Sequence, residues 1–367
     1  MKLDINKKSL IHPDLVEYGW DEVWESNLPQ LDLSQAFPAR VISEHRDRYW
    51  VHSETKDYSA RVSGKIKHQA TMPDDFPAVG DWVVIKPQGE ESGAVIQAIL
   101  PRRSKFSRKT VGKRTEEQVI AANLDMVWII SSFDFDLNPA RLERYITLVV
   151  ESGAKPVLLL TKADLSETPQ TIISDLMVRL VDVPVYAVSV VEPQGIDALR
   201  HFLEEGTTIA LLGSSGVGKS TLINHLAGSD VMHTAPVREK DGKGRHTTTH
   251  RELILLPGGG LLLDTPGMRE IQLWGPEEAL EKGFADIEKI AEGCRFSDCS
   301  HGAEPGCAVH EALEKGKIPQ DRIDNYKKLR EELVQLERNQ EVRTGIANKQ
   351  RRKTYTREPR HKFKDLS

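Results

Sequence analysis

The sequence predicts an α/β protein in which a doubly wound domain with a parallel sheet lies between a small β-barrel and a helical segment. Three observations predict this fold class. Short β-like runs occupy residues 39–99, apolar runs alternate with amphipathic segments over residues 123–267, and the three cysteines of the chain all lie within residues 294–307. At 367 residues the chain has room for two or three domains.

The composition narrows the classes of function. Hydrophobic residues make up 39% and charged residues 29% of the chain, as in soluble globular proteins. The net charge of −5 argues against a uniformly basic nucleic-acid-binding protein, although local basic patches are compatible with it. The sequence has no run of about 18 apolar residues, and Met1–Lys7 lacks the apolar core of a signal peptide. We therefore expect a cytoplasmic protein without a membrane partner.

Five short runs predict the barrel. Turn segments such as residues 77–81 and 89–93 separate them, and this spacing favours an OB-fold over an unspecialised β-domain. The runs are Ala39–Ile42, Arg48–His52, Ser59–Val62, Asp81–Ile85 and Ala94–Ile99. Residues 1–35 contain aromatic residues but no motif, and we interpret them as an extension that folds onto another part of the protein.

Longer apolar runs predict the strands of the buried parallel sheet. They are Leu124–Ser131, Lys155–Leu160, Val183–Ser189, Thr208–Leu212, Glu252–Leu256 and Gly260–Leu263. Amphipathic segments over Arg141–Glu151 and Pro169–Leu180 lie between them, and this alternation is typical of a doubly wound domain. Beyond Pro276 we expect helices, including a long charged helix over Asp321–Arg338.

A phosphate-binding loop is predicted directly after the run Thr208–Leu212. The pattern G-x-x-x-x-G-K-[ST] is matched in full, and a helix is expected from Lys219. Inward-turned backbone N–H groups can surround a phosphate, Lys219 can place its charge on the β- and γ-phosphates, and the Ser220 hydroxyl can bind Mg²⁺. The alternative is an ordinary glycine-rich turn before a helix. The residues of the loop are Gly213, Ser214, Ser215, Gly216, Val217, Gly218, Lys219 and Ser220.

The segment Asp264–Gly267 ends the predicted strand Gly260–Leu263 and supplies a second phosphate-side motif. An aspartate at the carboxyl end of such a strand can hold Mg²⁺ through water, and Gly267 can offer its N–H to the γ-phosphate. The D-x-x-G pattern is common by itself. Its position after the phosphate-binding loop makes it informative.

A base-binding motif is predicted at Thr161–Asp164, which resembles N-K-x-D with threonine in place of asparagine. Guanine presents two donors on one edge, and the Asp164 carboxylate can accept both, whereas adenine lacks that pair. The Lys162 stem can lie along the base plane. Because Thr161 cannot reproduce a carboxamide, we expect a weaker tie to the phosphate-binding loop. Ser189, at the end of the next strand, occupies the last base-side position; the alternative for the whole motif is a polar loop.

The base motifs precede the phosphate motifs, which is the reverse of the order in ordinary GTPases. The sheet tolerates this permutation because the site depends on neighbouring strand ends and not on chain order. At one end of the permuted domain, Gly267 leads directly toward the cysteines. The other end of the domain falls near Gly112, beside the barrel. We therefore expect the nucleotide state to influence both flanking domains.

The cysteine cluster predicts a metal site. Cys294, Cys299, His301 and Cys307 supply three thiolates and one imidazole, the ligand set of a closed tetrahedral zinc site with a structural role. His310 is an alternative to His301 as the fourth ligand. The other interpretation is that the cysteines are unrelated buried residues.

The permuted order, the barrel before it and the C-x₄-C-x-H-x₅-C cluster after it together resemble the ribosome small subunit-dependent GTPase A family. The matching segments are Thr161–Asp164, Gly213–Thr221, residues 244–249, Asp264–Gly267 and the cysteine cluster. The resemblance implies an OB-fold, a circularly permuted P-loop GTPase domain and a helical zinc-binding domain. It further implies GTP hydrolysis stimulated by the small ribosomal subunit, and a role in late maturation of that subunit. The implied partners and cofactors are GTP and GDP, the small subunit and its rRNA, Mg²⁺ with GTP, and one structural Zn²⁺; we expect a monomer.

The resemblance also assigns switch residues. Thr221 extends the phosphate-binding loop, and one threonine of residues 247–249, with Thr248 at their centre, senses Mg²⁺ and the γ-phosphate. Met268 stands where a water-orienting glutamine is expected, and a thioether cannot orient water. We therefore expect slow basal turnover and take His246 as the candidate catalytic group beside Lys219. The alternative is that His246 contacts rRNA or solvent.

Basic residues within 102–114 and 349–364 fit contacts to nucleic-acid phosphates, although such runs are more often solvated faces. The domain division that we predict is as follows: 1–35 extension, 36–112 OB-fold RNA-binding domain, 113–275 permuted GTPase domain, 276–340 zinc-binding helical domain, 341–367 basic tail.

Two other classes of function fit parts of the same pattern. One is a P-loop ATPase or small-molecule kinase, which Asp164 argues against because its carboxylate suits guanine. The other is a nucleotide-dependent RNA-binding clamp that does not hydrolyse GTP. Nucleotide preference separates the first from a GTPase, and turnover with and without small subunits separates the second.

Overall fold

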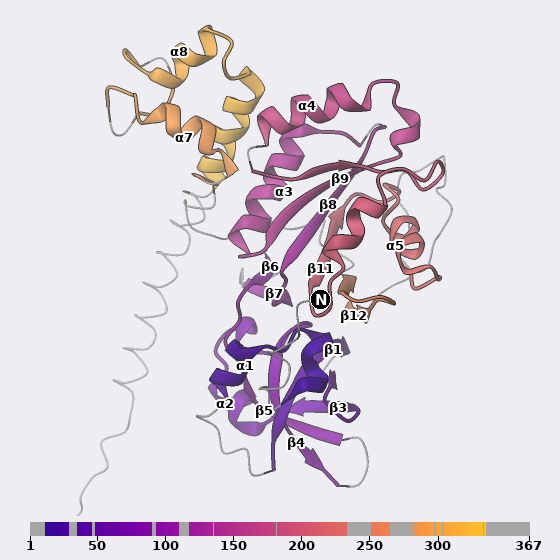
Figure 1. Ribbon diagram of the computed structural model, residues 1–367. Coiled ribbons are helices and arrows are strands. Elements are labelled where there is room, and N and C mark those ends of the chain that lie inside the picture. Colours follow the sequence, from indigo (N-terminus) through magenta and orange to yellow (C-terminus); the bar gives the residue numbers. More distant parts are fainter. Residues whose placement is uncertain are drawn as a thin grey trace, which may run out of the picture.

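The computed structural model confirms an α/β fold with a closed five-stranded barrel and a permuted sheet. Figure 1 shows the barrel at one end, the α/β sheet with its helices in the middle, and the cysteine-bearing region at the other end. The residues that the structure describes are 12–28, 35–45, 48–89, 93–109, 117–134, 136–180, 182–232, 251–264, 280–281, 283–296, 299–302, 304–332 and 334.

The barrel has the strand order β1-β2-β3-β5-β4, and β4 pairs back with β1 to close it. Its strands are β1 (Phe37–His45), β2 (Arg48–His52), β3 (Asp57–Val62), β4 (Trp82–Gln88) and β5 (Gly93–Ile99). Each of the five predicted runs falls on one of them. Side chains on β2 alternate between exposed and buried, as expected for a strand with one face on a core. A short helix, α2 (Gly64–Gln69), and the turn η2 (Pro73–Asp75) connect β3 to β4.

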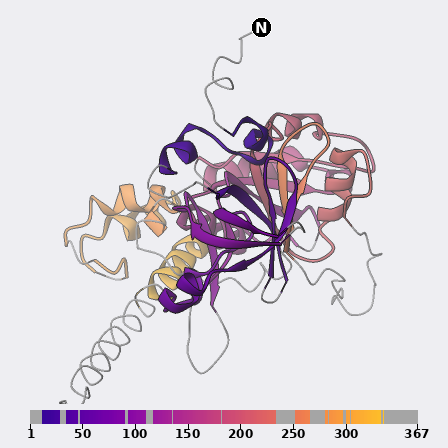
Figure 2. The same ribbon diagram turned by 90° about the horizontal axis from the view of Figure 1, so that it is seen from below.

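The N-terminal segment covers the outside of the barrel (Figure 2). It consists of η1 (Pro13–Tyr18) and α1 (Glu22–Asn27), and Asp21 caps α1 by accepting hydrogen bonds from two backbone N–H groups. The ring of Trp20 lies 4.7 Å from that of Trp82 on β4 and meets it edge-on. The prediction that this segment folds onto another part of the protein is confirmed for its described residues.

The α/β sheet has the strand order β10-β9-β8-β11-β13-β12. The first five of these strands are parallel to one another, whereas β12 runs antiparallel to β13. The prediction of a parallel strand at Glu252–Leu256 was therefore wrong. The link of residues 256–260 is a tight turn, and parallel neighbours need a crossover of a dozen or more residues. The strands are β8 (Met126–Ser132), β9 (Lys155–Thr161), β10 (Val185–Ala187), β11 (Thr208–Gly213), β12 (Arg251–Leu255) and β13 (Leu261–Asp264).

Helices cover both faces of this sheet, because successive strand residues point to opposite faces. On one face, α3 (Pro139–Glu151) and α4 (Pro169–Arg179) share one buried apolar cluster with Val127 and Ile129 of β8. On the other face, α5 (Lys219–Ala227) and η4 (Asp197–Phe202) share a second cluster with Trp128 and Ile130. The two amphipathic segments predicted before Thr208 form α3 and α4. The sheet is thus buried on both sides, and its polar groups are concentrated at the strand ends.

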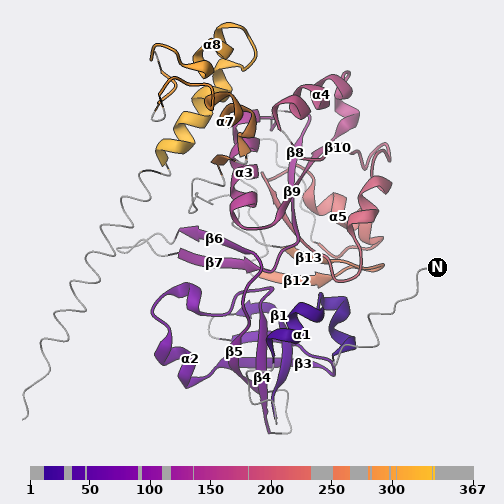
Figure 3. The same ribbon diagram turned by 60° about the vertical axis from the view of Figure 1, so that its left-hand side comes forward.

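A hairpin of β6 (Lys105–Lys109) and β7 (Glu117–Ala122) lies between the barrel and the sheet (Figure 3). The sequence indicated only a basic run here. Arg102, the first residue of the basic run, donates two hydrogen bonds to the fully buried carboxylate of Asp81. Arg103 is paired with Asp21. Arg102 is therefore held in a buried ion pair within the fold, whereas the Arg103 side chain is partly exposed. Contacts of this basic run to nucleic-acid phosphates stay a prediction.

Two features join the barrel to the sheet. Strand β1 pairs antiparallel with β12, so both parts share one 11-stranded sheet. Arg40 of β1 is 1% exposed and donates to Tyr18 O at 2.8 Å, Asn123 O at 3.1 Å and Thr208 Oγ1 at 3.3 Å. Burial lowers the pKa of Arg40 to about 10, so its guanidinium stays charged at neutral pH. Arg40 thus connects the N-terminal segment, the barrel and the first residue of β11.

The cysteine-bearing region contains α7 (Ala285–Ala291), α8 (Ala308–Glu314) and a helical stretch over residues 320–332. That stretch matches the predicted charged helix as far as residue 332; residues 335–338 lie outside the described part of the chain. The buried carboxylate of Glu143 on α3 accepts from Arg322 at 2.7 Å and from Asn325 at 2.6 Å, which docks the region on the α/β sheet. Among the described residues, none of the helices combines the length and apolar character needed to cross a membrane.

Candidate functional site

The predicted phosphate-binding loop lies between β11, which ends at Gly213, and α5, which begins at Lys219. Gly216 and Gly218 have φ angles of 80° and 92°, a left-handed conformation that favours glycine. A Cβ at Gly213 would lie 2.2 Å from Ile130 O, so β8 approaches this loop closely and only glycine fits. Lys219 Nζ donates to Gly213 O at 3.0 Å and to Ser214 O at 2.5 Å. The lysine ammonium therefore lies over the loop where phosphates are expected.

The predicted base and phosphate motifs lie at the same edge of the sheet. Strands β9, β8, β11 and β13 are parallel, and their carboxyl ends are Thr161, Ser132, Gly213 and Asp264. The chain runs from β8 outward to β9 and β10, then returns to β11 on the other side of β8. This reversal of direction between β8 and β11 is a topological switch point, where α/β proteins bind nucleotides.

Thr161 links the base loop to the phosphate-binding loop. Its Oγ1 lies 2.5 Å from Val217 O and 3.1 Å from Ser131 O. A hydroxyl has one proton, so it donates to one of these carbonyl oxygens at a time. The expected weaker link between the base loop and the phosphate-binding loop is refined accordingly. The threonine hydroxyl does reach the phosphate-binding loop, but it offers one hydrogen-bond donor where the amide of an asparagine offers two.

The side chains of the base motif have fixed partners. Ser189 Oγ donates to Asp164 Oδ1, so a residue after β10 orients the carboxylate predicted to recognise guanine. Ser189 is 1% exposed, and its Oγ also accepts from Glu192 N–H at 3.1 Å. Lys162 Nζ lies 2.6 Å from Asp134 Oδ2, at the end of β8. Asp134 was missed by the sequence analysis, because no motif marks the loop in which it lies.

Several predicted residues lie outside the described part of the chain. They are Thr247, Thr248, Thr249, His246, Gly267 and Met268, together with the tail from residue 349. Asp264 is the last residue of β13, opposite Glu252 of β12. This backbone position is the strand end at which the metal-side aspartate was predicted.

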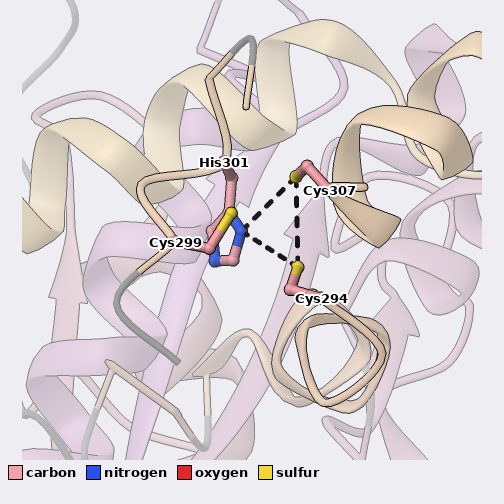
Figure 4. A group of neighbouring side chains, drawn as sticks. All are labelled: Cys294, Cys299, His301 and Cys307. Atoms are coloured by element: carbon pink, nitrogen blue, oxygen red, sulfur yellow. Dashed lines mark hydrogen bonds between the residues drawn. The ribbon is translucent and has the colours of Figure 1, made fainter. Parts of the chain in front are cut away.

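The four predicted metal ligands converge in the cysteine-bearing region (Figure 4). Cys294 Sγ lies 3.7 Å from His301 Nδ1 and 4.0 Å from Cys307 Sγ, and Cys307 Sγ lies 3.8 Å from His301 Nδ1. The ligand atoms of all four residues, Cys299 included, are within 4.8 Å of one another. Zinc–sulfur bonds of about 2.3 Å place tetrahedral ligands about 3.8 Å apart, so this group fits a zinc-sized ion.

The surroundings suit a metal-bound histidine. Burial, together with the charges of Arg330 and Lys327, lowers the pKa of His301 and favours the neutral ring that binds metals. The ring presents Nδ1 to the sulfurs. His310, the alternative ligand, faces Glu314 on α8 instead and is half-exposed.

Known proteins resemble this chain over most of its length. A protein of Oceanobacillus iheyensis called small ribosomal subunit biogenesis GTPase RsgA 1 is 43% identical over 325 residues, which cover 88% of this chain and 91% of the relative. A second relative is the small ribosomal subunit biogenesis GTPase RsgA of Xanthomonas axonopodis pv. citri. It is 42% identical over 361 residues, which cover 95% of this chain and 96% of the relative. The family model described as RsgA GTPase matches residues 99–274. The chain belongs to the RsgA GTPase family.

Solved structures show the same architecture for this RsgA-family GTPase. YjeQ from Thermotoga maritima is 26% identical with a TM-score of 0.61, and the match covers 82% of this chain and 99% of that one. YloQ, described as a circularly permuted GTPase, is 26% identical with a TM-score of 0.58, covering 83% and 96%. A second family model, described as 50S ribosome-binding GTPase, matches residues 208–344. That match begins at β11, the strand at which a GTPase of ordinary motif order would start.

Proposed function

We propose that this RsgA-family GTPase acts in late maturation of the small ribosomal subunit, and that contact with the subunit stimulates its hydrolysis of GTP to GDP and phosphate. One observation supports guanine specificity most directly. Asp164, held by Ser189, lies at the sheet edge that also carries the phosphate-binding loop, and Thr161 hydrogen-bonds that loop. The relatives' printed names supply the small subunit as partner.

Each part of the nucleotide has a candidate ligand in the chain. We assign the phosphates to backbone N–H groups of residues 213–221 and to Lys219, and the base to Lys162, Asp164 and Ser189. Ser220, Asp264 and Thr248 would hold Mg²⁺, which supplies charge neutralisation on the phosphates when bound. His246 would orient or deprotonate the attacking water, because Met268 cannot. We also propose that Cys294, Cys299, His301 and Cys307 hold one structural zinc ion.

The barrel offers a surface for rRNA. Trp50 on β2 is 42% exposed, and it pairs with Ser59 of β3. Arg48 and Arg61, both exposed, are the next residues on the outward face of these strands beyond the paired Tyr49 and Ala60. Arg48 donates a hydrogen bond to Ser59 Oγ at 3.4 Å, and both exposed guanidinium groups are suited to nucleic-acid phosphates. An exposed aromatic ring beside two arginines on strands 2 and 3 of an OB-like barrel is suited to a stacked base.

RNA binding followed by tryptophan fluorescence tests this surface, and Trp50→Ala separates the signal of Trp50 from that of the other five tryptophans. We expect a single-stranded RNA oligonucleotide to quench emission in the wild type, with a loss of binding of roughly tenfold in Trp50→Ala, the size of one stacking contact. Val178→Ala is the matched control, since Val178 is 81% exposed on α4. Equal binding by the wild type and Trp50→Ala would assign RNA contacts to another surface.

We propose a cytoplasmic monomer and the domain division 1–35, 36–112, 113–275, 276–340 and 341–367. Nucleotide preference tests the guanine site: GTP should bind far more tightly than ATP, and equal binding would favour an ATPase or kinase. Turnover distinguishes a hydrolase from an RNA-binding clamp, because a clamp would bind GTP without releasing phosphate.

A further inference from the structure

The end of β8 and the residue after it contact the base motif through two backbone groups. Ser131 O lies 3.1 Å from Thr161 Oγ1, as one of the two carbonyl oxygens that this hydroxyl can reach, and Phe133 N–H donates to Thr161 O at 3.0 Å. Strands β8 and β9 are parallel neighbours, and their last paired residues are Ser132 and Thr161. The start of the base motif is therefore fixed against the end of β8.

Asp134 adds a charged contact to these two. Its Oδ2 lies 2.6 Å from Lys162 Nζ, while its Oδ1 accepts from Ser132 Oγ at 2.6 Å and from Asp136 N–H at 3.1 Å. Burial acts to raise the pKa of Asp134, but the hydrogen bonds from Lys162, Ser132 and Asp136 outweigh it and hold the pKa below its ordinary value. The Asp134 carboxylate is thus ionised and is oriented by hydrogen bonds from Ser132 and Asp136. It is therefore a fixed partner for the Lys162 ammonium group.

The backbone of Lys162 also indicates a residue held by its surroundings. Its φ and ψ angles are 58° and 40°, a left-handed conformation that residues with a side chain adopt rarely. The Lys162 side chain is about one-third exposed, so water competes for its ammonium group. An ordered partner such as Asp134 is needed to keep a flexible lysine stem in one direction.

We propose that Asp134 is a positioning residue for guanine-nucleotide binding, which holds the Lys162 ammonium so that the lysine stem forms a preset wall for the base. The inference rests on the proposed function, because it requires Lys162 to belong to the base site. Ordering the stem before the nucleotide arrives removes an entropy cost from binding. The phosphate chemistry lies on other strands, so Asp134 affects affinity and not the hydrolytic step.

Nucleotide binding and turnover of the full-length chain test this role. For Asp134→Asn we expect the Kd of a fluorescent N-methylanthraniloyl GDP to rise roughly tenfold, as for one part-exposed charge-assisted hydrogen bond. We expect kcat at saturating GTP to stay within about twofold of the wild type, because binding is changed and not the transition state. In a Lys162→Met background, Asp134→Asn should have no additional effect, since the partner is already absent.

Asp197→Asn is the control: it makes the same change at a carboxylate that is 97% exposed on η4 and pairs with Arg200. Among the contacts that the structure describes, Asp197 touches neither Asp134 nor Lys162, so its Kd should equal that of the wild type. Ser132→Ala, which removes one support of Asp134, should raise the Kd by a smaller factor and serves if Asp134→Asn does not fold.

Two results would overturn the inference. One is wild-type affinity in both Asp134→Asn and Ser132→Ala. The other is an equal loss of affinity with and without the Lys162 side chain. A wild-type protein that binds ATP as tightly as GTP would instead overturn the proposed function, so the two failures are distinguishable.

Discussion

Thr161 Oγ1 lies 2.5 Å from Val217 O, so one hydroxyl connects the base loop with the phosphate-binding loop across 56 residues of chain. Both loops follow parallel strands that β8 separates in the sheet. The bond makes the distance between the two halves of the candidate site a property of the fold. The predicted base loop and the predicted phosphate-binding loop are thereby geometrically coupled.

Thr161→Val keeps the shape of this side chain and removes the hydroxyl. We expect GTP and GDP affinity to fall by about three- to tenfold, the range for one neutral hydrogen bond. Thr161→Asn should recover or exceed wild-type affinity, because an amide can donate to Val217 O and Ser131 O together. Isothermal titration with GDP measures both. Wild-type affinity in Thr161→Val would show that the bond does not contribute to binding.

Asp164→Asn should change base preference from GTP toward xanthosine triphosphate. The new amide offers one donor and one acceptor, which matches a base with a carbonyl in place of the 2-amino group. Competition binding with the two nucleotides measures the ratio. Asp197→Asn, at a carboxylate that is 97% exposed on η4, is the control and should leave the ratio unchanged. If Asp164→Asn retained full preference for GTP, the assignment of Asp164 to the base site would be wrong.

Cys299→Ser should release the metal. We expect about one equivalent of zinc per wild-type chain, and far less in the variant, because ligand loss uncouples metal binding from folding. GTP affinity should be retained, since the base and phosphate loops lie elsewhere in the fold. The melting temperature should nevertheless fall, because Cys299 and Cys307 share one apolar core with Leu142 and Ile146 of α3.

The control for the metal experiment is His310→Ala, whose side chain faces Glu314 and not the sulfurs. It should keep its zinc. Elemental analysis of wild-type protein purified without chelators gives the direct answer, and finding no zinc there would contradict the assignment. A zinc-free Cys299→Ser protein with wild-type stability would contradict the coupling to the α3 core.

Arg40→Met should destabilise the joint between the barrel and the α/β sheet. Three acceptors on Tyr18, Asn123 and Thr208 would lose their buried donor, at a cost of about 1–3 kcal/mol in the free energy of unfolding for each unsatisfied group. Arg40→Lys should rescue little, because an ammonium lacks the guanidinium fork that reaches separate acceptors. Urea denaturation measures the loss, and an unchanged midpoint would show that β1–β12 pairing alone holds the joint.

Local patterns in the sequence were enough to predict the barrel strands, the phosphate-binding loop and the ligand cluster, because each depends on residues close together in the chain. The antiparallel direction of β12 and the β6–β7 hairpin were not predicted. Their signals are turn geometry and tertiary pairing, which periodicity does not encode. Arg40 could not be recognised as a joint, because its acceptor on Thr208 is 168 residues away. Asp134 was missed for the same reason, since its role depends on which loop β8 places beside Lys162.

Phosphate release at saturating GTP measures whether the small ribosomal subunit stimulates GTP hydrolysis by this chain, as we propose. We predict slow turnover alone, a large increase with purified small subunits, no comparable increase with large subunits, and no turnover in Lys219→Ala under any condition. His246→Ala should bind GTP normally and lower the stimulated rate by roughly 10²–10⁴, if it moves a proton or orients water. Stimulation by large subunits alone, or turnover that small subunits leave unchanged, would contradict a GTPase stimulated by the small subunit.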